Sequence, residues 1–219
     1  MTIKEISEGV FKIDGRIATA NFVKGQKVYD EDLRKVNGVE YRLWNPYRSK
    51  LAAAFLKGMK TMRIAKGSSV LYLGAATGTT CSHISDIVGD TGVVYCVENS
   101  ERSMRDLLSI CDSRKNMMPI FSDARNTKEY GPEVGVVDVL YQDVSARDQA
   151  SILVDNSQFL KEKGYAYVAI KSQSISVSKN PSIVYKEFLK QVSTVFKTVE
   201  SIDIRPFDQK HLFVVLQKL

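Results

Sequence analysis

The sequence contains no apolar run long enough to cross a membrane, and its first residues lack the apolar segment of a signal peptide. It has only three cysteines, Cys81, Cys96 and Cys111, which are far apart and form no C-x-x-C pair. Neither a zinc site nor a disulfide framework is therefore expected. Internal repeats and low-complexity segments are also absent. These absences indicate a reduced, intracellular globular protein with no metal centre and no membrane partner.

Acidic residues are missing between Tyr41 and Ser85, although the whole chain has 25 of them and a net charge of +6. An unbalanced basic block of this kind favours a polyanionic partner, most simply nucleic acid. A solvated basic helix face is the alternative that charge patterning leaves open. The lysines and arginines of the block are Arg42, Arg48, Lys50, Lys57, Lys60, Arg63 and Lys66.

The length of 219 residues suits one domain with a small appendage. The first 47 residues differ from the rest, because short alternating segments flank Asp14-Gly15 and Asn37-Gly38, which are strong hairpin signals. We expect residues 1–47 to form a small antiparallel β domain that is too short to be stable alone. The second domain is expected over residues 48–219.

From residue 48 onward the hydrophobic period alternates between helix and strand, a pattern typical of βαβ units and a parallel sheet. The last two strands have no helix between them, so we expect them to pair antiparallel. The predicted fold class is α/β and Rossmann-like, with a mostly parallel seven-stranded sheet and one reversed strand. Expected helices cover 48–59, 82–88, 101–111, 148–160 and 181–196, and expected strands cover 70–73, 93–97, 117–121, 136–141, 165–170, 198–204 and 212–216.

The stretch VLYLGAATGTT at residues 70–80 predicts a strand, a glycine turn and the first turn of a helix. This arrangement is the usual nucleotide cradle of open α/β sheets. The turn reads G-x-x-x-G from Gly74, and it lacks the second glycine that lets dinucleotide binders approach a pyrophosphate. A cofactor with an adenosine but no pyrophosphate fits better, and S-adenosylmethionine is the obvious one. An ordinary glycine turn is the alternative for this motif alone.

Ionisable residues follow four successive strands of the predicted sheet, namely Glu98, Asp123, Asp143 and Lys171. Ligands of open α/β sheets bind at the carboxyl edge of the strands, so we expect these side chains to share one site. Glu98 is expected to accept hydrogen bonds from ribose hydroxyls. Asp123 is expected to accept one from an adenine amine, with the small Ala124 admitting the ring. Each acid alone could be a cap or a solvated loop residue, but the set favours a cofactor site.

Methyl transfer to a hydroxyl requires the oxygen to lie in line with the methyl group and its proton to be weakened or removed. Lys171 is the candidate for acting on that hydroxyl, either as a base or as a cation that stabilises the developing alkoxide. Asp143 is expected to orient Lys171. Lys50 is expected to hold the substrate backbone or to join the same cluster. A surface salt bridge is the alternative for each lysine alone.

Four separated segments make the chain resemble the fibrillarin family in its archaeal form: GVFKIDGRIATANFVKGQKVY, NPYRSKLAAA, VLYLGAATGTTCSHISDIVGDTG and IKSQSI. The resemblance implies an S-adenosylmethionine-dependent ribose 2′-O-methyltransferase, the catalytic subunit of a box C/D ribonucleoprotein that modifies pre-rRNA and, in archaea, tRNA. It implies that a guide RNA paired to the target sets the specificity. The implied protein partners are a coiled-coil scaffold protein of the Nop family and a kink-turn-binding protein of the ribosomal L7Ae type. Because the sequence shows no Gly/Arg-rich tail of the kind that eukaryotic members carry, the resemblance implies an archaeal cytoplasmic protein.

The resemblance also implies site residues. The family's catalytic Lys-Asp-Lys-His tetrad is similar to Lys50, Asp143, Lys171 and His211, the last of which would otherwise be interpreted as a structural histidine. Asn99 departs from the family, where an aromatic is common, and Ala146 stands where a glutamine is common, so a cofactor contact is in doubt at each. The implied cofactor-binding residues are Gly74, Thr79, Thr80, Glu98, Asn99, Asp123, Ala124, Asp143, Val144, Ser145 and Ala146.

Two other functions stay open. The first is a non-catalytic RNA-binding component of the same type of particle, although the complete set of tetrad residues favours catalysis. The second is a methyltransferase for a small molecule, which fits the basic block at residues 41–85 poorly and lacks an obvious substrate-capping domain.

Overall fold

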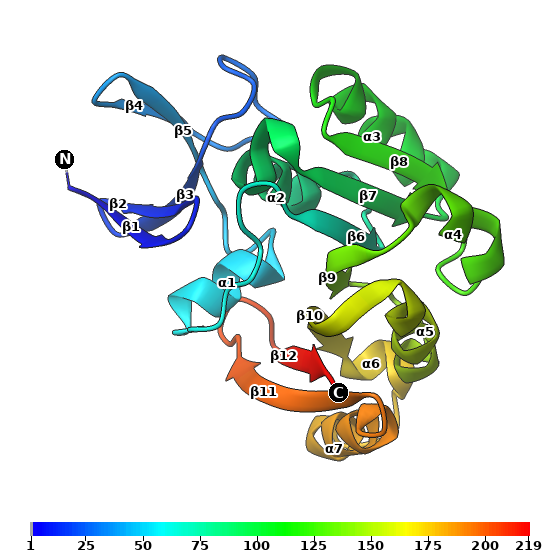
Figure 1. The fold of residues 1–219 in the computed structure, drawn as a ribbon. Coiled ribbons are helices and arrows are strands. Elements are labelled where there is room, and N and C mark those ends of the chain that lie inside the picture. Colours follow the sequence, from blue (N-terminus) through cyan, green and yellow to red (C-terminus); the bar gives the residue numbers. More distant parts are fainter. Residues whose placement is uncertain (1) are drawn as a thin grey trace.

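The computed structural model describes residues 2–219, which form a small sheet beside a larger one that is covered by helices (Figure 1). The small sheet is antiparallel, with the strand order β1-β2-β3-β5-β4. Asp14-Gly15 and Asn37-Gly38 connect its hairpins, and all four residues have positive φ, as tight primed turns require. The predicted hairpins are confirmed. The strands are β1 (Ile3–Ser7), β2 (Val10–Ile13), β3 (Arg16–Ala20), β4 (Leu33–Val36) and β5 (Val39–Leu43).

The larger sheet has seven strands in the order β11-β12-β10-β9-β6-β7-β8. Only β12 runs against its neighbours, pairing antiparallel with both β10 and β11, while the remaining ladders are parallel. The predicted mostly parallel sheet with one reversed strand is therefore confirmed. Its strands are β6 (Ser69–Leu73), β7 (Val93–Glu98), β8 (Met117–Phe121), β9 (Val137–Gln142), β10 (Leu160–Lys171), β11 (Phe196–Asp203) and β12 (His211–Lys218).

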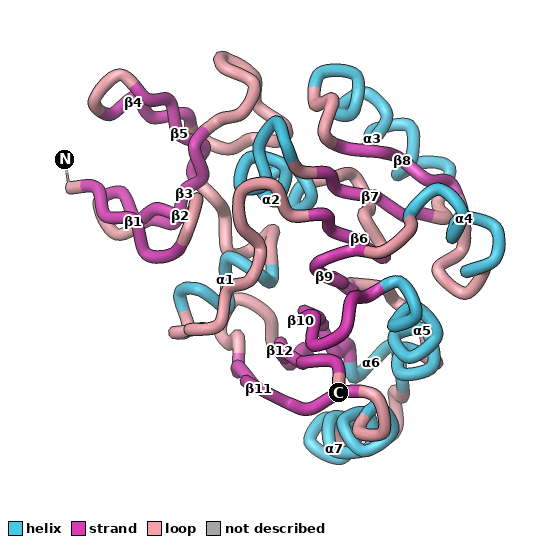
Figure 2. Tube along the Cα trace, viewed as in Figure 1, coloured by secondary structure: helices cyan, strands magenta, loops and turns pink. Residues whose placement is uncertain are grey.

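Helices cover both faces of the larger sheet (Figures 1 and 2). Alternation along the strands divides the core: Val70 and Tyr72 pack toward α1, α2 and α3, and Leu71 and Leu73 pack toward α4, α5 and α7. The helices are α1 (Lys50–Leu56), α2 (Thr79–Val88), α3 (Glu101–Ser113), α4 (Thr127–Val134), α5 (Gln149–Asn156), α6 (Ser172–Ile175) and α7 (Pro181–Val192), with 3₁₀ turns at Gly89–Thr91 and Ser157–Phe159.

Several element boundaries differ from the sequence-based expectations for local reasons. Helix α1 is shorter than expected because the Ser49 side chain caps its start and Gly58, at φ +88°, follows its end. Helix α2 starts at Thr79, three residues early, since Gly78 turns the chain in the left-handed conformation. Strand β10 starts at Leu160, which pairs with Val137 of β9 before an irregularity in the ladder. Strand β1 and helices α4 and α6 were not predicted.

Buried charged groups join the small sheet to α2. Asp86 of α2 accepts hydrogen bonds from Thr19 Oγ1 at 2.6 Å, from Arg42 Nη1 at 2.9 Å and from Arg114 Nη1 at 2.7 Å. Arg42 also pairs with Glu31 at 2.7 Å, and the Arg42, Glu31 and Asp86 side chains are fully buried. The expected domain boundary after residue 47 lies between β5 and α1, so this polar cluster spans it.

In the described part of the chain, no helix has both the length and the apolar character needed to cross a membrane. The three cysteines are buried and carry free thiols. Among residues 2–219, no group of three or more His, Cys, Asp or Glu side chains is placed to hold a metal ion.

Candidate active site

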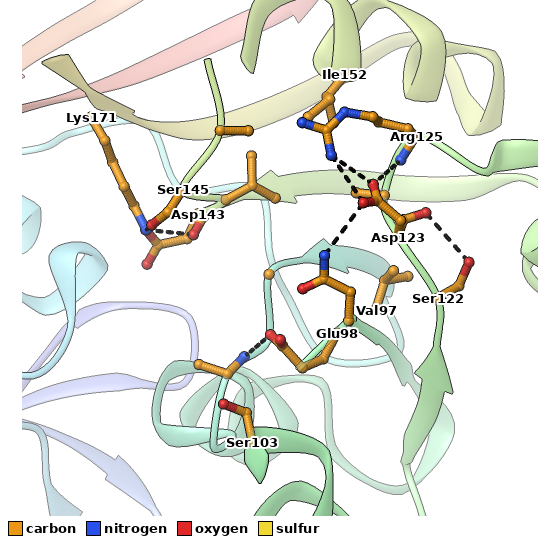
Figure 3. Close-up of a pocket in the computed structure, with 16 residues that line it drawn as sticks. Val97, Glu98, Ser103, Ser122, Asp123, Arg125, Asp143, Ser145, Ile152 and Lys171 are labelled. Carbon is orange, nitrogen blue, oxygen red and sulfur yellow. Dashed lines mark hydrogen bonds and ion pairs between the residues drawn. The ribbon is translucent and has the colours of Figure 1, made fainter. Parts of the chain in front are cut away.

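A cleft of about 280 Å³ lies at the carboxyl ends of β6, β7, β8, β9 and β10 (Figure 3). This is the edge at which open α/β sheets bind ligands. Its lining includes most of the predicted site residues, and it adds several that the sequence did not single out. The lining residues are Gly74, Ala76, Val97, Glu98, Asn99, Ser103, Ser122, Asp123, Ala124, Arg125, Asp143, Val144, Ser145, Ala146, Ile152 and Lys171.

Gly74 lets two strand-end loops approach each other. Its φ is +81°, and a Cβ placed there would lie 2.9 Å from the carbonyl oxygen of Asp143. A larger residue would therefore both strain the turn and push away the loop that follows β9. The glycine that the sequence singled out serves close backbone packing at the floor of the cleft.

Glu98 ends β7 and is buried except for 8% of its surface. Its carboxylate accepts hydrogen bonds from the backbone N–H of Ala76 at 2.8 Å and of Ser100 at 2.7 Å. Figure 3 shows the Glu98 side chain turned toward the glycine loop. Each carboxylate oxygen retains acceptor capacity, so Glu98 can both fix this loop and accept from a ligand hydroxyl.

Asp123 follows β8 at the opposite side of the cleft (Figure 3). It accepts from the backbone N–H of Arg125 at 2.9 Å, and Nη1 of the same arginine lies 3.1 and 2.9 Å from its two oxygens. The Asn99 side-chain amide donates to it at 3.4 Å. Ala124 is buried, and its carbonyl oxygen accepts from Tyr130 and Asn156 at 2.9 Å each, which fixes this strand end.

Lys50 and Lys171 converge on the carboxylate of Asp143. Lys50 Nζ lies 3.1 Å from Asp143 Oδ1, and Lys171 Nζ lies 2.9 Å from the same oxygen. Burial alone would raise the pKa of Asp143, but the two ammonium groups outweigh it and hold that pKa below its ordinary value. Asp143 is therefore ionised near neutral pH, and its carboxylate orients both lysine side chains.

Further contacts place Lys171 and His211 at the same edge. Lys171 Nζ also donates to the Asp143 carbonyl at 2.7 Å and to Ser145 Oγ at 3.1 Å. Lys171 ends β10 and is the register partner of His211, which begins β12. His211 Nδ1 lies 2.6 Å from Asp208 Oδ2. Burial lowers the pKa of His211; Asp208 opposes this shift, while the charges of Lys50 and Lys171 add to it.

Thr79 and Thr80 lie outside the lining of this cleft. Thr80 is buried and donates from Oγ1 to Ser49 Oγ at 3.0 Å, and Ser49 caps the helix that starts at Lys50. Thr79 faces a second cleft together with Tyr29 and Arg48. The structure thus gives Thr80 a supporting contact beneath the helix that carries Lys50.

Sequence reasoning missed Arg125, Asp148 and Asp208. Arg125 lies two residues beyond a predicted acid, and Asp208 lies three residues before the predicted histidine, but each is in a loop. Loop residues follow no period, so only their tertiary contacts reveal them.

The lining suits an adenosyl cofactor better than a polyphosphate. Its two cationic side chains, Arg125 and Lys171, are already paired with carboxylates. Glu98 and Asp123 also line the cleft, and their carboxylate oxygens keep acceptor capacity beside the hydrogen bonds that they already receive, as the hydroxyls and amine of an adenosine require. The residues present therefore fit S-adenosylmethionine.

Comparisons with known proteins identify the family of the chain. The chain is 48% identical to a fibrillarin-like rRNA/tRNA 2′-O-methyltransferase of Methanocaldococcus jannaschii, over 97% of this chain and 95% of that one. A crystal structure of Aeropyrum pernix fibrillarin with natively bound S-adenosyl-L-methionine matches with a TM-score of 0.91 and 43% identity, covering 99% and 98% of the two chains. The structure of a fibrillarin/Nop5p complex matches with a TM-score of 0.90 and 37% identity, covering 99% of this chain and 100% of that one. The fibrillarin family model matches residues 1–218, so this chain belongs to the fibrillarin family.

Proposed function

We propose that this chain transfers the methyl group of S-adenosylmethionine to ribose 2′-hydroxyls of rRNA and tRNA, as the catalytic subunit of a guide-RNA particle. The observation that supports this most strongly is the convergence of Lys50 and Lys171 on Asp143 beside the cleft. His211 lies at the same sheet edge as the register partner of Lys171. Two cations held by one buried carboxylate suit an acceptor that develops negative charge.

The cofactor is assigned to the cleft, with Glu98 accepting from the ribose hydroxyls and Asp123-Ala124 holding the adenine. Gly74 and the loop Asp143–Ala146 border the reactive end. Asn99 lines the same cleft, and its amide takes the place of the family's usual aromatic. When bound, S-adenosylmethionine supplies an electrophilic methyl group on a sulfonium.

The tetrad acts on the acceptor hydroxyl. Because Lys171 Nζ forms an ion pair with the carboxylate of Asp143 at 2.9 Å, we assign Lys171 the role of donor to the developing alkoxide rather than that of base. Lys50 Nζ lies 3.1 and 3.2 Å from the two carboxylate oxygens of Asp143 and keeps the carboxylate from turning. His211 is neutral near pH 7 because its pKa is lowered, so its imidazole can accept the hydroxyl proton.

The pH dependence of the reaction tests the role of His211. A folded-state pKa below the ordinary 6.5 means that the imidazolium forms only as the pH falls below that value. We expect kcat/KM to decline on the acid side with an apparent pKa below 6.5, and we expect His211→Asn to be slower and to lack this decline. If the His211→Asn variant showed the same decline of kcat/KM at acid pH, the titrating group would be a residue other than His211.

We infer that the chain works in a particle with a Nop-family scaffold protein, an L7Ae-type kink-turn-binding protein and a box C/D guide RNA. A fibrillarin of this fold forms a complex with Nop5p, which supports the scaffold assignment. The basic residues between Tyr41 and Ser85 support contact with RNA. The archaeal sources of its relatives support a cytoplasmic location in an archaeon.

Transfer of tritiated methyl groups to a guide-matched RNA tests this function. With the reconstituted particle we expect label at the single ribose that the guide specifies, and little label when the guide RNA is omitted. Label that appears equally without guide RNA would argue against guided specificity. A particle that assembles but transfers no label would favour the non-catalytic RNA-binding role.

A further inference from the structure

Arg125 ties together two loops at the nucleoside end of the cleft. Its Nη1 lies 2.9 Å from one oxygen of Asp123, in the loop after β8. Its Nε and Nη2 donate to the two oxygens of Asp148 at 2.8 and 2.6 Å, and Asp148 lies at the end of the loop after β9. Figure 3 shows the guanidinium directly above Asp123 and beside Ile152. One planar cation thus bridges the two carboxylates.

Asp148 contacts Arg125 instead of accepting the capping hydrogen bond that an aspartate at the start of a helix usually accepts. It occupies the N-cap position of α5, where an aspartate normally accepts from a backbone N–H of the first turn. Here its side chain makes no capping bond, and both oxygens face Arg125. A bidentate arginine–carboxylate pair is geometrically specific and stronger than a single-point surface pair. Asp148 therefore ties the loop to Arg125 and leaves the start of α5 without a side-chain cap.

The bridged loop also reaches the tetrad. It begins at Asp143 and contains Ser145, which accepts from Lys171 Nζ at 3.1 Å. Its far end is Asp148, which Arg125 holds against Asp123. The loop that borders the cofactor cleft is thus held at its start by the backbone, where the Asp143 N–H donates to the Leu73 carbonyl at 2.9 Å, and at its far end by the guanidinium.

We propose that Arg125 is a positioning residue for the cofactor: it sets the separation of the two loops and orients Asp123 toward the adenine. The inference rests on the proposed function only in assigning S-adenosylmethionine to this cleft. Without the bridge, Asp123 keeps only the backbone N–H of residue 125 and the Asn99 amide as donors, and the loop after β9 loses its outer anchor. Cofactor binding must then also order Asp123 and this loop, and the conformational entropy lost in doing so lowers the affinity.

Calorimetric titration with S-adenosylmethionine tests this role. We expect Arg125→Gln to raise the Kd roughly tenfold, and Asp148→Asn to raise it by a similar factor, because either change removes the bidentate pair. In the double variant the two effects should not add, since both report the same bridge. Arg125→Lys should restore only part of the affinity, because an ammonium cannot bridge in a planar fork.

Two further readouts separate positioning from general structure. The difference between wild type and Arg125→Gln should shrink at high salt, since the bridge is partly exposed, and the KM for S-adenosylmethionine should rise more than kcat falls. Arg16→Gln is the matched control, because Arg16 forms a similarly exposed pair with Asp32 in the small sheet. The Kd of the Arg16→Gln variant for S-adenosylmethionine should equal that of wild type.

The outcomes distinguish the two proposals. A wild-type protein that binds no S-adenosylmethionine would overturn the cofactor assignment and this inference with it. A wild type that binds, together with Arg125→Gln and Asp148→Asn variants whose Kd stays within twofold, would overturn only the role of Arg125. Fully additive losses in the double variant would also overturn it, because they would assign the two residues separate contacts.

Discussion

Replacement of Lys171 by alanine is expected to lower methyl transfer about a hundredfold to ten-thousandfold while leaving the affinity for S-adenosylmethionine nearly unchanged. The ammonium of Lys171 lies 2.9 Å from Asp143 Oδ1, and the Lys171 side chain is only 12% exposed. Its removal takes away a charge that matters only when the acceptor oxygen becomes negative. Single-turnover transfer in the assembled particle measures the loss, and calorimetry measures cofactor binding.

Lys161→Ala provides the matched control. Lys161 lies on the same strand, β10, and pairs with Asp138 at 2.6 Å, but it is far along the strand from the cleft. We expect this variant to transfer methyl groups at the wild-type rate. Lys171→Ala turnover within a few fold of wild type would remove Lys171 from the mechanism. Equal losses in both variants would point to general damage to β10.

Replacement of Asp86 by asparagine is expected to lower the free energy of unfolding by about 3–5 kcal/mol. The carboxylate is fully buried and accepts from both Arg42 and Arg114, so its neutralisation leaves two guanidinium groups with Glu31 as the nearest remaining carboxylate partner. A buried charge without a partner is costly because it has lost its hydration. The midpoint of thermal unfolding should fall by roughly 10 °C for a chain of this length.

Asp32→Asn is the comparison for this prediction, because Asp32 forms an exposed pair with Arg16 of the small sheet. Exposed pairs of this kind contribute about 0–1 kcal/mol, so its unfolding midpoint in urea should stay close to that of wild type. If Asp86→Asn lowered the free energy of unfolding by less than 1 kcal/mol, water would have to enter the cluster and solvate Arg42 and Arg114.

The strand and helix order of the larger sheet could be predicted because its buried strands are short apolar runs between turn signals. The elements that escaped prediction lack such a signal. Strand β1 has no fully buried residue and no alternating apolar pattern; backbone pairing with β2 and partial packing of Ile3 against the small-sheet core hold it. Helix α4 contains Gly131 and Pro132 and buries only Tyr130 and Val134. Tertiary contacts decide the structure of such segments.

The candidate site divides in the same way. Glu98, Asp123, Asp143 and Lys171 could be placed together from the sequence, since the carboxyl ends of parallel strands meet at one edge. The bridge from Arg125 to Asp148 joins two loops that are 23 residues apart, and no spacing rule indicates it. The contact of Thr80 with Ser49 depends on how α1 packs beside α2. Both are consequences of packing that a single sequence does not display.

The reversed direction of β12 determines which sequence changes among family members the edge beside Lys171 can accommodate. Because β12 runs against β10, it brings its first residue, His211, to that edge, and residues 204–210 form the loop of a hairpin there. The register of the two strands is set along the whole ladder, which extends from Lys171–His211 to Tyr165–Gln217. Insertions or deletions in this loop would leave that register intact. Family members can therefore differ in this loop without separating Lys171 from His211.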